Sequence, residues 1–340
     1  MKQIFVKDLK PGVPLSNIPF VVIKLEKKIT KAGKDYMDIT IGDKTGSIIG
    51  KIWSDKYDAC SVDKLKEGSV VLLSGSAGEF MGKVQITITM AIIADQFDEE
   101  DFVPVTKKSI DELMSYLNEQ IDSISDRHLR KLITAMLSDE KFLTVFKRTP
   151  AAMKLHHAYV GGLLEHICEM MRFAIPMCEV YQPCNCDLVK AGIILHDIGK
   201  TEEIVWKNMA IEYSDRGKLL GHVQLGLQII DKYKQSDFDG ECLALLQHII
   251  IAHHGKIEYG AVVIPATIEA KIVSLADDSS AKLRGYMSLY EDGVGNGASF
   301  SEYSRTLETM VYVKEYQSAL EQFMEKAEET NKKLEQLELL

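Results

Sequence analysis

Histidine and aspartate recur through the second half of the chain, inside apolar segments or at their ends. The apolar run that begins at Ala191, for example, ends in the polar pair His196–Asp197. Burying an imidazole beside a carboxylate is costly unless something compensates both groups, and a divalent metal ion is their common partner. Seven residues share this pattern: His166, His196, Asp197, His222, His253, His254 and Asp277. The pattern predicts a hydrolytic metal site in this half of the chain.

The bulk composition is that of a globular chain with room for two cores: 340 residues, 46% hydrophobic and 26% charged. Lys2, Lys7 and Lys10 lie where a signal peptide would be apolar, so we expect none. No apolar run reaches the roughly 18 residues of a membrane-spanning helix. The six cysteines are scattered, and Cys184 with Cys186 is too little for a zinc site. We therefore expect reduced thiols, a cytoplasmic protein and no membrane partner.

Charge is unevenly distributed along the chain, whose formal net charge is −10. Residues 1–94 carry 14 lysines, no arginine and 10 acidic residues, so this part is +4 and the remainder is −14. A basic part is thus joined to an acidic one, which is a marked asymmetry of charge along the chain. Bound divalent cations would neutralise some of the acidic excess.

The first 95 residues have the pattern of a small β-barrel. Apolar runs and period-two alternation mark five short strands, at residues 20–25, 36–41, 47–53, 69–74 and 83–89. A Gly-Asp-Lys-Thr-Gly turn at 42–46 separates the second strand from the third. This order resembles an oligonucleotide-binding (OB) fold. The expected fold class is a multi-domain α and β chain: a five-stranded OB-like barrel followed by an all-α domain.

A charged joint at residues 98–101, followed by Pro104, marks the expected domain boundary. From Ser109, which opens a capping box with Glu112, the apolar period becomes 3.6. Helices are expected at 126–148, 157–180, 186–198, 220–232, 240–254 and 265–285, without strands among them. The expected units are 1–95 (OB fold), 96–150 (linker and helical connection), 151–305 (metal domain) and 306–340 (amphipathic helix).

The last segment has a heptad pattern. Two apolar series recur every seven residues: Val313, Leu320, Ala327 and Leu334, and then Tyr316, Phe323, Thr330 and Leu337. This seam either packs on its own domain or joins copies of the chain. We expect a homo-oligomer formed through helical surfaces.

Two residues of the metal pattern are expected to act directly on the substrate. Neighbours on a helix point about 100° apart, so His196 and Asp197 should not chelate one ion side by side. The short carboxylate of Asp197 could instead bridge two ions. Lys200 lies one turn beyond Asp197 and could hold a phosphate oxygen as a point charge. Asp197 and Lys200 are therefore the expected catalytic residues.

Lysines and aromatic residues gather in the predicted barrel. The expected nucleic-acid-binding residues are Lys24, Lys27, Lys28, Lys31, Lys34, Tyr36 and Trp53, with Tyr57 and Phe80 nearby in sequence. Positive charge along a backbone and aromatic platforms for bases bind single strands without sequence preference. The alternative is that the lysines only solvate the barrel and the aromatic rings fill its core.

The order His, His-Asp, His, His-His, Asp resembles the HD superfamily of metal-dependent phosphohydrolases, and His-Asp-Ile-Gly-Lys at 196–200 is among its most specific signatures. An OB-like barrel before such a domain is similar to the YhaM-type 3′→5′ exoribonucleases of low-GC Gram-positive bacteria. Residues 155–166, 195–200 and 251–255 carry this similarity. It implies activation by Mn²⁺ or Co²⁺, with Fe²⁺ or Zn²⁺ as further candidates, and release of nucleoside monophosphates from a 3′ end. His156, His157 and Asp278 either approach the same cavity or lie on the surface.

The leading hypothesis is a metal-dependent 3′→5′ exonuclease that acts on single-stranded RNA, with single-stranded DNA as a further candidate substrate. We expect it to bind two metal ions, and Mn²⁺ is favoured. One alternative is a phosphohydrolase that acts on free nucleotides, because fold does not fix substrate. The barrel argues against it, since a mononucleotide needs no extended groove. A second alternative is a non-catalytic nucleic-acid-binding protein stabilised by a metal. Structural zinc sites usually include cysteine, and the seven candidate ligands include none.

Overall fold

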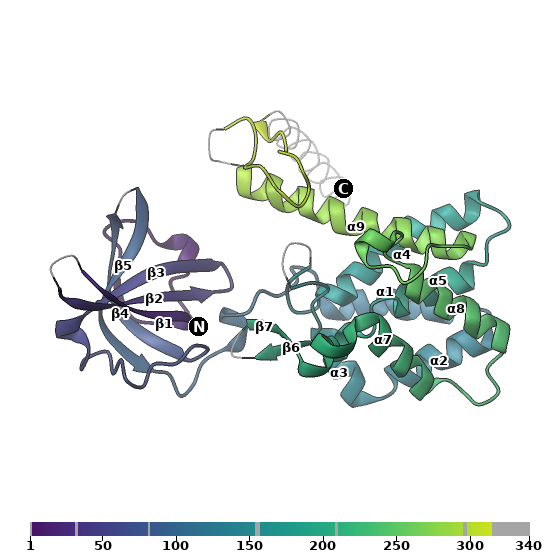
Figure 1. The fold of residues 1–340 in the computed structure, drawn as a ribbon, viewed down its shortest axis with the longest axis horizontal. Coiled ribbons are helices and arrows are strands. Elements are labelled where there is room, and N and C mark those ends of the chain that lie inside the picture. Colours follow the sequence, from purple (N-terminus) through teal and green to yellow (C-terminus); the bar gives the residue numbers. More distant parts are fainter. Residues whose placement is uncertain are drawn as a thin grey trace, which may run out of the picture.

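The structure, a computed structural model, describes residues 2–30, 33–80, 82–153, 157–207, 210–294 and 298–314. A β-barrel and a helical domain lie side by side (Figure 1). None of the described helices is both long and apolar enough to cross a membrane. All six cysteines are free thiols.

The N-terminal domain is the expected five-stranded barrel. Its strands are β1 (Pro14–Ile29), β2 (Asp35–Asp43), β3 (Gly46–Trp53), β4 (Val70–Phe80) and β5 (Lys83–Ile93). They close in the order β1-β2-β3-β5-β4, with β3 and β5 parallel and the other neighbours antiparallel. Alternate residues such as Ile39 and Ile41, or Ile86 and Ile88, are fully buried inside, which explains the period of two in the sequence.

A buried ion pair ties the start of the chain to the barrel. The Lys2 Nζ atom lies 2.5 Å from Asp43 Oδ2, and both side chains are inaccessible to solvent. The ammonium also lies 3.8 Å from the centre of the Phe20 ring. Asp43 accepts further hydrogen bonds from the backbone N–H groups of Val6 (2.8 Å) and Thr45 (2.9 Å). These contacts satisfy a carboxylate that would otherwise be costly to bury.

The segment that joins the two domains, residues 101–105, is held by contacts over almost its whole length. On the barrel side, Asp101 accepts the N–H groups of Lys2 and Lys44, and Phe102 packs on the barrel. On the helical side, Val105 forms a parallel bridge with Val160. Only residues 103 and 104 lie between these two sets of contacts, so the chain can bend little at this point.

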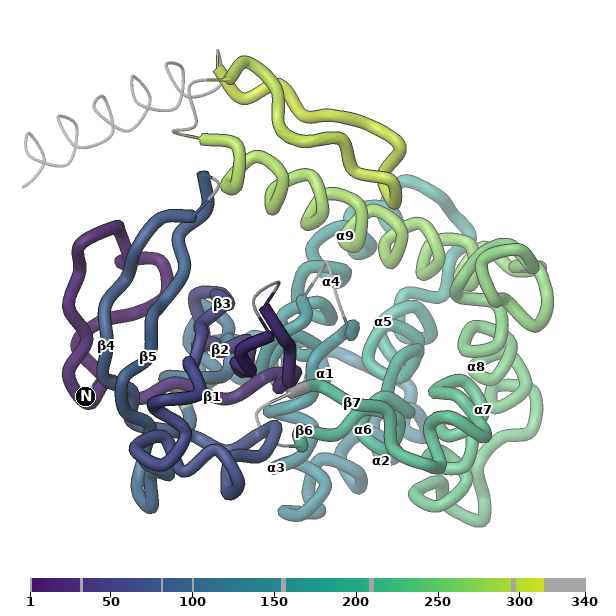
Figure 2. The backbone as a smooth tube through the Cα atoms, turned by 60° about the vertical axis from the view of Figure 1, so that its left-hand side comes forward, coloured from purple at the N-terminus to yellow at the C-terminus, as the bar shows by residue number. Residues whose placement is uncertain are grey.

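The helical domain is built around one apolar core. Its helices are α1 (Ile110–Asp122), α2 (Arg127–Leu137), α3 (Glu140–Arg148), α4 (Gly162–Val180), α5 (Cys186–Leu195), α6 (Lys200–Glu203), α7 (Asp215–Tyr233), α8 (Gly240–Ala252) and α9 (Ile268–Gly293). The helices α4, α5 and α9 pack on one another at its centre (Figure 2). α5 buries nearly its whole length, as the apolar run before His196 predicts.

Several expected boundaries differ from those observed. The segment 126–148 forms two helices, because Asp139 caps a new helix with its side chain. α4 begins five residues later than expected, since Gly161 before it has the left-handed φ of 79°. Residues 298–313 contain no helix and form bridges such as Phe300–Tyr312, so the expected helix from 306 is wrong up to Val313. Apart from Val313, which is buried, the heptad seam lies outside the described residues.

The expectation of a domain without strands is also wrong. Strands β6 (Ile204–Lys207) and β7 (Ala210–Tyr213) form a hairpin on the side of the helical domain nearest the barrel (Figure 1). Each strand has only four residues, which is too short to produce a clear alternation in the sequence. Glu212 of this hairpin lines a cavity together with Val21 and Gly68 of the barrel.

The turn between α5 and α6 lies directly against the backbone of α7. A Cβ atom at Gly199 would lie 1.9 Å from the carbonyl oxygen of His222 and 2.5 Å from the nitrogen of Gly226. These are backbone atoms and cannot rotate away. The glycine of the Asp-Ile-Gly-Lys sequence is therefore required by packing.

We predict that Gly199→Ala lowers the free energy of unfolding by about 2–3 kcal/mol, because the turn and α7 must separate. Urea unfolding of the metal-free protein measures this. Gly226→Ala is the matched control, since its Cβ would meet no atom closer than 3.5 Å. It should change stability by less than about 1 kcal/mol. Equal stability of the two variants would contradict the packing argument.

Candidate metal centre

Five helices and one turn bring the seven predicted ligands together. His166 lies in the second turn of α4, and Asp277 lies in α9. His196 is the C-cap of α5, and Asp197 follows it in the turn before α6. The other three are His222 in α7, His253 at the C-cap of α8, and His254.

Asp197 lies between two groups of ligand atoms. His166, His196 and Asp197 can place one ligand atom each within 4.8 Å of one another, and so can His222, His253 and His254. Asp197 Oδ2 lies 3.3 Å from His196 Nε2, whereas Oδ1 lies 3.4 Å from His222 Nε2 and 3.7 Å from His253 Nε2. One carboxylate therefore faces both groups.

His196 and His253 are each oriented by a hydrogen bond to a backbone carbonyl oxygen. Each ends its helix, and each donates Nδ1–H to the carbonyl oxygen three residues earlier, that of Ile193 (2.8 Å) or Ile250 (2.6 Å). Because Nδ1 carries a proton in this contact, Nε2 is the nitrogen of each ring that is left to bind a metal. Both Nε2 atoms point into the centre and have no hydrogen-bond partner there.

A break in α7 exposes His222 to the centre. Gly221, directly before it, has φ 69° and ψ 159°, which interrupts the helix. The freed N–H of His222 donates to Glu203 Oε1 at 3.0 Å, and the ring Nδ1 lies 3.3 Å from the same oxygen. Glu203 thereby directs Nε2 of His222 toward Asp197. No pattern in the sequence singled out Glu203, which is buried at the end of α6.

The charges of the centre are set by burial and by the neighbouring ligands. Burial lowers the pKa of His253 to about 3 and also lowers the pKa values of His166 and His254, so these rings are neutral at pH 7. Burial would raise the pKa of Asp197, but the Lys200 ammonium and the imidazoles outweigh it and hold that pKa well below its usual range. Neutral imidazole and ionised carboxylate are the forms that bind metal ions.

These residues fit a divalent metal. Among the buried side-chain atoms of the described residues that lack a hydrogen-bond partner, five belong to the predicted ligands: Asp197 Oδ1, His196 Nε2, His222 Nε2, His253 Nε2 and His254 Nδ1. Such atoms are rarely left unpaired in a folded protein. Imidazole and carboxylate donors without thiolate suit Mn²⁺, Fe²⁺, Co²⁺ and Zn²⁺.

One expectation about the ligand pair was wrong. His196 and Asp197 direct their ligand atoms to the same point, with 3.3 Å between Nε2 and Oδ2. The expected 100° divergence of neighbouring side chains does not keep these two atoms apart, although His196 still has the helical φ of −55° and ψ of −42°. Lys200 lies beside them: its Nζ is 2.5 Å from Asp197 Oδ2 and donates to the carbonyl oxygen of Ala151.

The three residues left open in the sequence have different positions. His157 is completely buried, and its ring centre lies 5.3 Å from that of His166. Its Nε2 lies 3.0 Å from Glu169 Oε2. Asp278 is exposed and pairs with Lys282 on the surface of α9. His156 lies outside the described residues.

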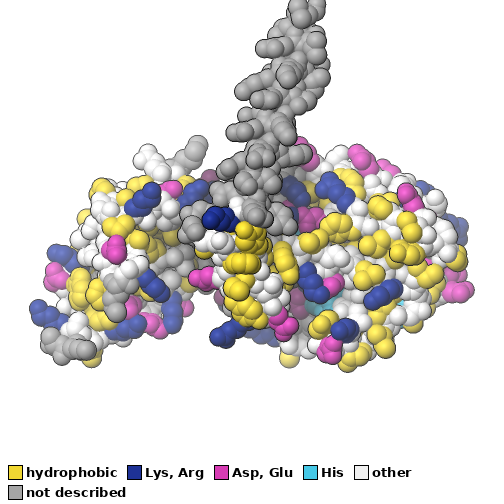
Figure 3. Space-filling view, turned by 90° about the horizontal axis from the view of Figure 1, so that it is seen from above, with side chains coloured by type: hydrophobic (Ala, Val, Ile, Leu, Met, Phe, Trp, Pro, Cys, Tyr) yellow, Lys and Arg dark blue, Asp and Glu magenta, His cyan; other side chains and the backbone are white. Residues whose placement is uncertain are grey.

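The predicted basic surface of the barrel is largely neutralised. Lys24 pairs with Glu26, Lys27 with Asp35, and Lys28 with both Glu26 and Asp38. Lys34 is exposed, and Lys31 lies outside the described residues. Basic and acidic side chains are interspersed over both domains on the face shown in Figure 3. The sequence showed the lysines. Glu26 lies on the same strand as Lys24 and Lys28, whereas the pairing of β1 with β2 brings Asp35 and Asp38 to Lys27 and Lys28.

A groove of about 640 Å³ on β2, β3 and β5 was missed from sequence. Lys51, Lys83 and the half-exposed Phe80 line it. The Lys51 ammonium lies 4.8 Å from the centre of the Tyr36 ring, and Tyr36 packs on Trp53 with 5.4 Å between ring centres. The two predicted aromatic residues therefore border this groove. Tyr57 instead packs against the barrel core.

Comparisons with known proteins agree with this architecture. The sequence model of the HD domain family matches residues 163–282. The protein named 3′-5′ exoribonuclease YhaM of Shouchella clausii is 32% identical over 265 residues, which are 76% of this chain and 80% of that protein. Its namesake of Listeria innocua is 30% identical over 271 residues, 78% of this chain and 84% of that protein.

Among solved structures, the second OB-fold domain of replication protein A from Methanococcus maripaludis is 20% identical, with a TM-score of 0.22. It covers 27% of this chain and 95% of that domain. The relatives above, at 30% identity or more over 76–78% of the chain, identify the family. This chain is a hydrolytic enzyme of the YhaM exoribonuclease family, with an HD domain behind its barrel.

Proposed function

We propose that this chain is a metal-dependent 3′→5′ exonuclease that degrades single-stranded RNA to nucleoside monophosphates. One observation carries the proposal: the five buried ligand atoms without a hydrogen-bond partner that belong to Asp197 and to four of the histidines gathered with it. Relatives named 3′-5′ exoribonuclease support RNA as the substrate and the direction of degradation. They favour this function over hydrolysis of free nucleotides.

The ligand set supports two divalent ions. The proposed ligands are the seven residues predicted from the sequence. Six of them form the two groups that both adjoin Asp197, and the seventh, Asp277, lies beside His166. When bound, such ions lower the pKa of a water molecule and polarise a phosphoryl oxygen. Donors without thiolate are compatible with Mn²⁺, which the family resemblance favours, and equally with Co²⁺, Fe²⁺ or Zn²⁺.

The surrounding residues would support hydrolysis in distinct ways. Asp197 would join the two ligand groups through its two oxygens. Glu203 would keep Nε2 of His222 directed at the centre through its contact with Nδ1. Lys200, which is 15% exposed, would offer its ammonium to a non-bridging phosphate oxygen of the substrate.

The barrel groove supports binding of an extended strand. Lys51 and Lys83 supply positive charge, while Phe80 and the Tyr36–Trp53 pair supply stacking surfaces. Such contacts do not read the 2′-hydroxyl, so we include single-stranded DNA as a second substrate. The six free thiols support a reducing, cytoplasmic location. Self-association through the C-terminal helix remains a prediction from the sequence.

Asp197→Asn should abolish hydrolysis of a 5′-labelled RNA oligomer in Mn²⁺. The amide is a poor metal ligand and cannot neutralise Lys200. A loss of at least about 1,000-fold is expected, since activation of water depends on the bound ions. The circular dichroism spectrum, which reports the fold, and the affinity for the RNA strand should both be unchanged. Asp278→Asn is the matched control, because that exposed residue contacts only Lys282 among the ion pairs described. Near-normal turnover of folded, metal-loaded Asp197→Asn would contradict the assignment.

Removing the groove contacts should weaken binding of long strands. In Lys51→Ala with Phe80→Ala, one stacking surface and one charge are lost, so we expect Kd for a 20-nucleotide RNA to rise about 10- to 100-fold. A plot of the logarithm of the association constant against the logarithm of the salt concentration has a negative slope, and its magnitude should fall by about 0.7. Cleavage of a dinucleotide should be unchanged.

Two variants control for loss of charge and of an exposed ring. Lys24→Ala removes an ion-paired lysine of the barrel, and Tyr181→Ala removes an exposed ring of the helical domain. Both should bind the 20-nucleotide RNA as the wild type does. Equal binding by the groove variant would show that the strand lies elsewhere.

A further inference from the structure

We propose that Ser280 and Glu169 are positioning residues that hold His166 in the tautomer able to bind metal through Nε2. His166 Nδ1 lies 3.0 Å from Ser280 Oγ, and Ser280 Oγ donates to Glu169 Oε2 at 3.2 Å. Ser280 and His166 are each only 1% exposed, so water does not replace these contacts. The proposal rests on the metal centre of the proposed function.

The direction of each hydrogen bond follows from the groups present. An ionised carboxylate only accepts, so the single hydroxyl hydrogen of Ser280 must point to Glu169. The oxygen of Ser280 can then only accept from His166, which places the proton on Nδ1. The neutral ring of His166 therefore keeps its lone pair on Nε2, the nitrogen that faces the other ligands.

A competing acceptor makes this assignment consequential. Asp277 Oδ1 lies 3.2 Å from His166 Nε2. This carboxylate could therefore accept a hydrogen bond from Nε2 if the proton were on that nitrogen. Asp277 and Ser280 are three residues apart and therefore share one face of α9. One helix thus presents acceptors to both nitrogens of His166. Without the Ser280 hydroxyl, the proton would move to Nε2 and block the metal-binding lone pair.

Glu169 is kept ionised by the Arg284 and Lys108 cations and by its contact with His157. Its carboxylate contacts the Arg284 guanidinium, Lys108 Nζ at 3.1 Å and His157 Nε2 at 3.0 Å. Burial would raise the pKa of Glu169, but His157, Arg284 and Lys108 outweigh it and lower that pKa. A carboxylate held in this way is a reliable acceptor for Ser280.

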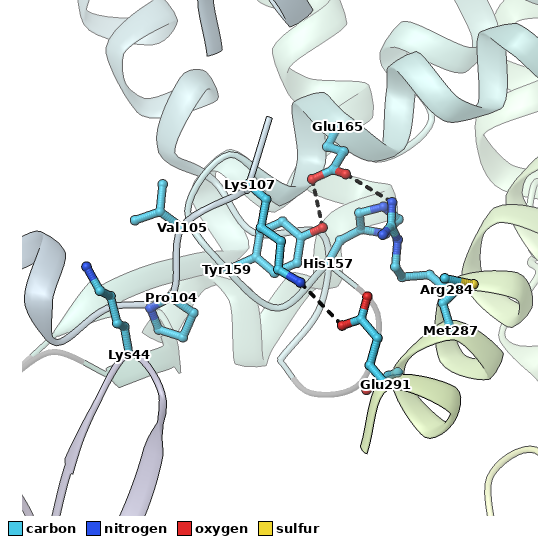
Figure 4. A pocket seen from close by; sticks show the side chains of 11 residues that line it. Lys44, Pro104, Val105, Lys107, His157, Tyr159, Glu165, Arg284, Met287 and Glu291 are labelled. Carbon is cyan, nitrogen blue, oxygen red and sulfur yellow. Dashed lines mark hydrogen bonds and ion pairs between the residues drawn. The ribbon is translucent and has the colours of Figure 1, made fainter. Parts of the chain in front are cut away.

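The same cations fix the position of Glu169. Arg284 and Lys108 also contact Glu165, which accepts from Thr106 Oγ1 (2.5 Å) and Tyr159 Oη (2.7 Å). Figure 4 shows Glu165 between Tyr159 and Arg284 at the wall of a cavity of about 360 Å³. Thr106 and Lys108 belong to the joint that follows the barrel. The carboxylate behind Ser280 is therefore anchored to three separate parts of the chain.

His166 differs in this respect from His196 and His253. Backbone carbonyls orient His196 and His253, and no side-chain substitution removes those. His166 depends on a hydroxyl that can be deleted with little change in volume. Removing a hydrogen-bond partner of a metal-binding histidine typically lowers the affinity for the metal about 10- to 100-fold.

The test uses the full-length protein with Ser280→Ala, Glu169→Gln and the control Ser279→Ala. Ser279 is the half-buried neighbour of Ser280 on α9, so its variant makes the same deletion one residue away. Calorimetric titration with Mn²⁺ should show Kd raised about 10- to 100-fold in Ser280→Ala, raised less in Glu169→Gln, and unchanged in Ser279→Ala. Ser280→Ala with the affinity of Ser279→Ala would overturn the proposal.

A second measurement reads the tautomer without metal. Nitrogen-15 NMR of the metal-free protein, with the signals assigned by their loss in His166→Gln, should show a protonated Nδ1 in the wild type. In Ser280→Ala the proton should lie on Nε2. A protonated Nε2 in the wild type would reject the proposal even if the metal binds. A wild type that binds no Mn²⁺ would instead reject the metal centre, and the NMR result would still decide the tautomer.

Discussion

The carboxylate of Asp197 is the group on which the arrangement of the helical domain depends. It is only 3% exposed, yet it carries a negative charge among the ends of four different helical segments. An isolated buried charge would be far too costly to keep, so the surrounding imidazoles and Lys200 must stay in place. Gly199 allows the turn that carries Asp197 to touch α7, and the break at Gly221 brings His222 to it.

The ligands of this centre could be predicted because they interrupt apolar segments. His196, His253 and Asp277 follow or divide runs that would otherwise be uniform core helices, and that contrast is visible in one sequence. The barrel was predictable for a similar reason, since the period of two extends over several strands. In both cases the signal is the hydrophobic pattern, which burial imposes directly.

The residues that orient the ligands could not be predicted in the same way. Glu203 and Ser280 lie among other polar residues, whereas Glu169 lies in the apolar run of α4. Only tertiary contacts distinguish them: Glu203 and Ser280 lie beside ring nitrogens, and Glu169 accepts from Ser280. Binding of nucleic acid by the lysines of β1 stays a prediction, and their ion pairs with Glu26 on the same strand and with Asp35 and Asp38 on β2 could not be read from local patterns. Lys51 was overlooked because its importance comes from the adjacent Tyr36 ring. Polar contacts of this kind depend on tertiary packing, which local patterns do not specify.

The short joint between the domains has a consequence for the length of the products. Contacts of Asp101 and Phe102 hold it to the barrel, and those of Val105, Thr106 and Lys108 hold it to the helical domain. The groove and the metal centre are therefore joined by a short segment that is held on both sides, and the distance between them sets the minimum length of a strand that can reach both. In the proposed reaction, a strand that spans this distance is gripped at both places. Once trimming makes it shorter, it loses the barrel contact and dissociates, so degradation would slow at a characteristic oligonucleotide length.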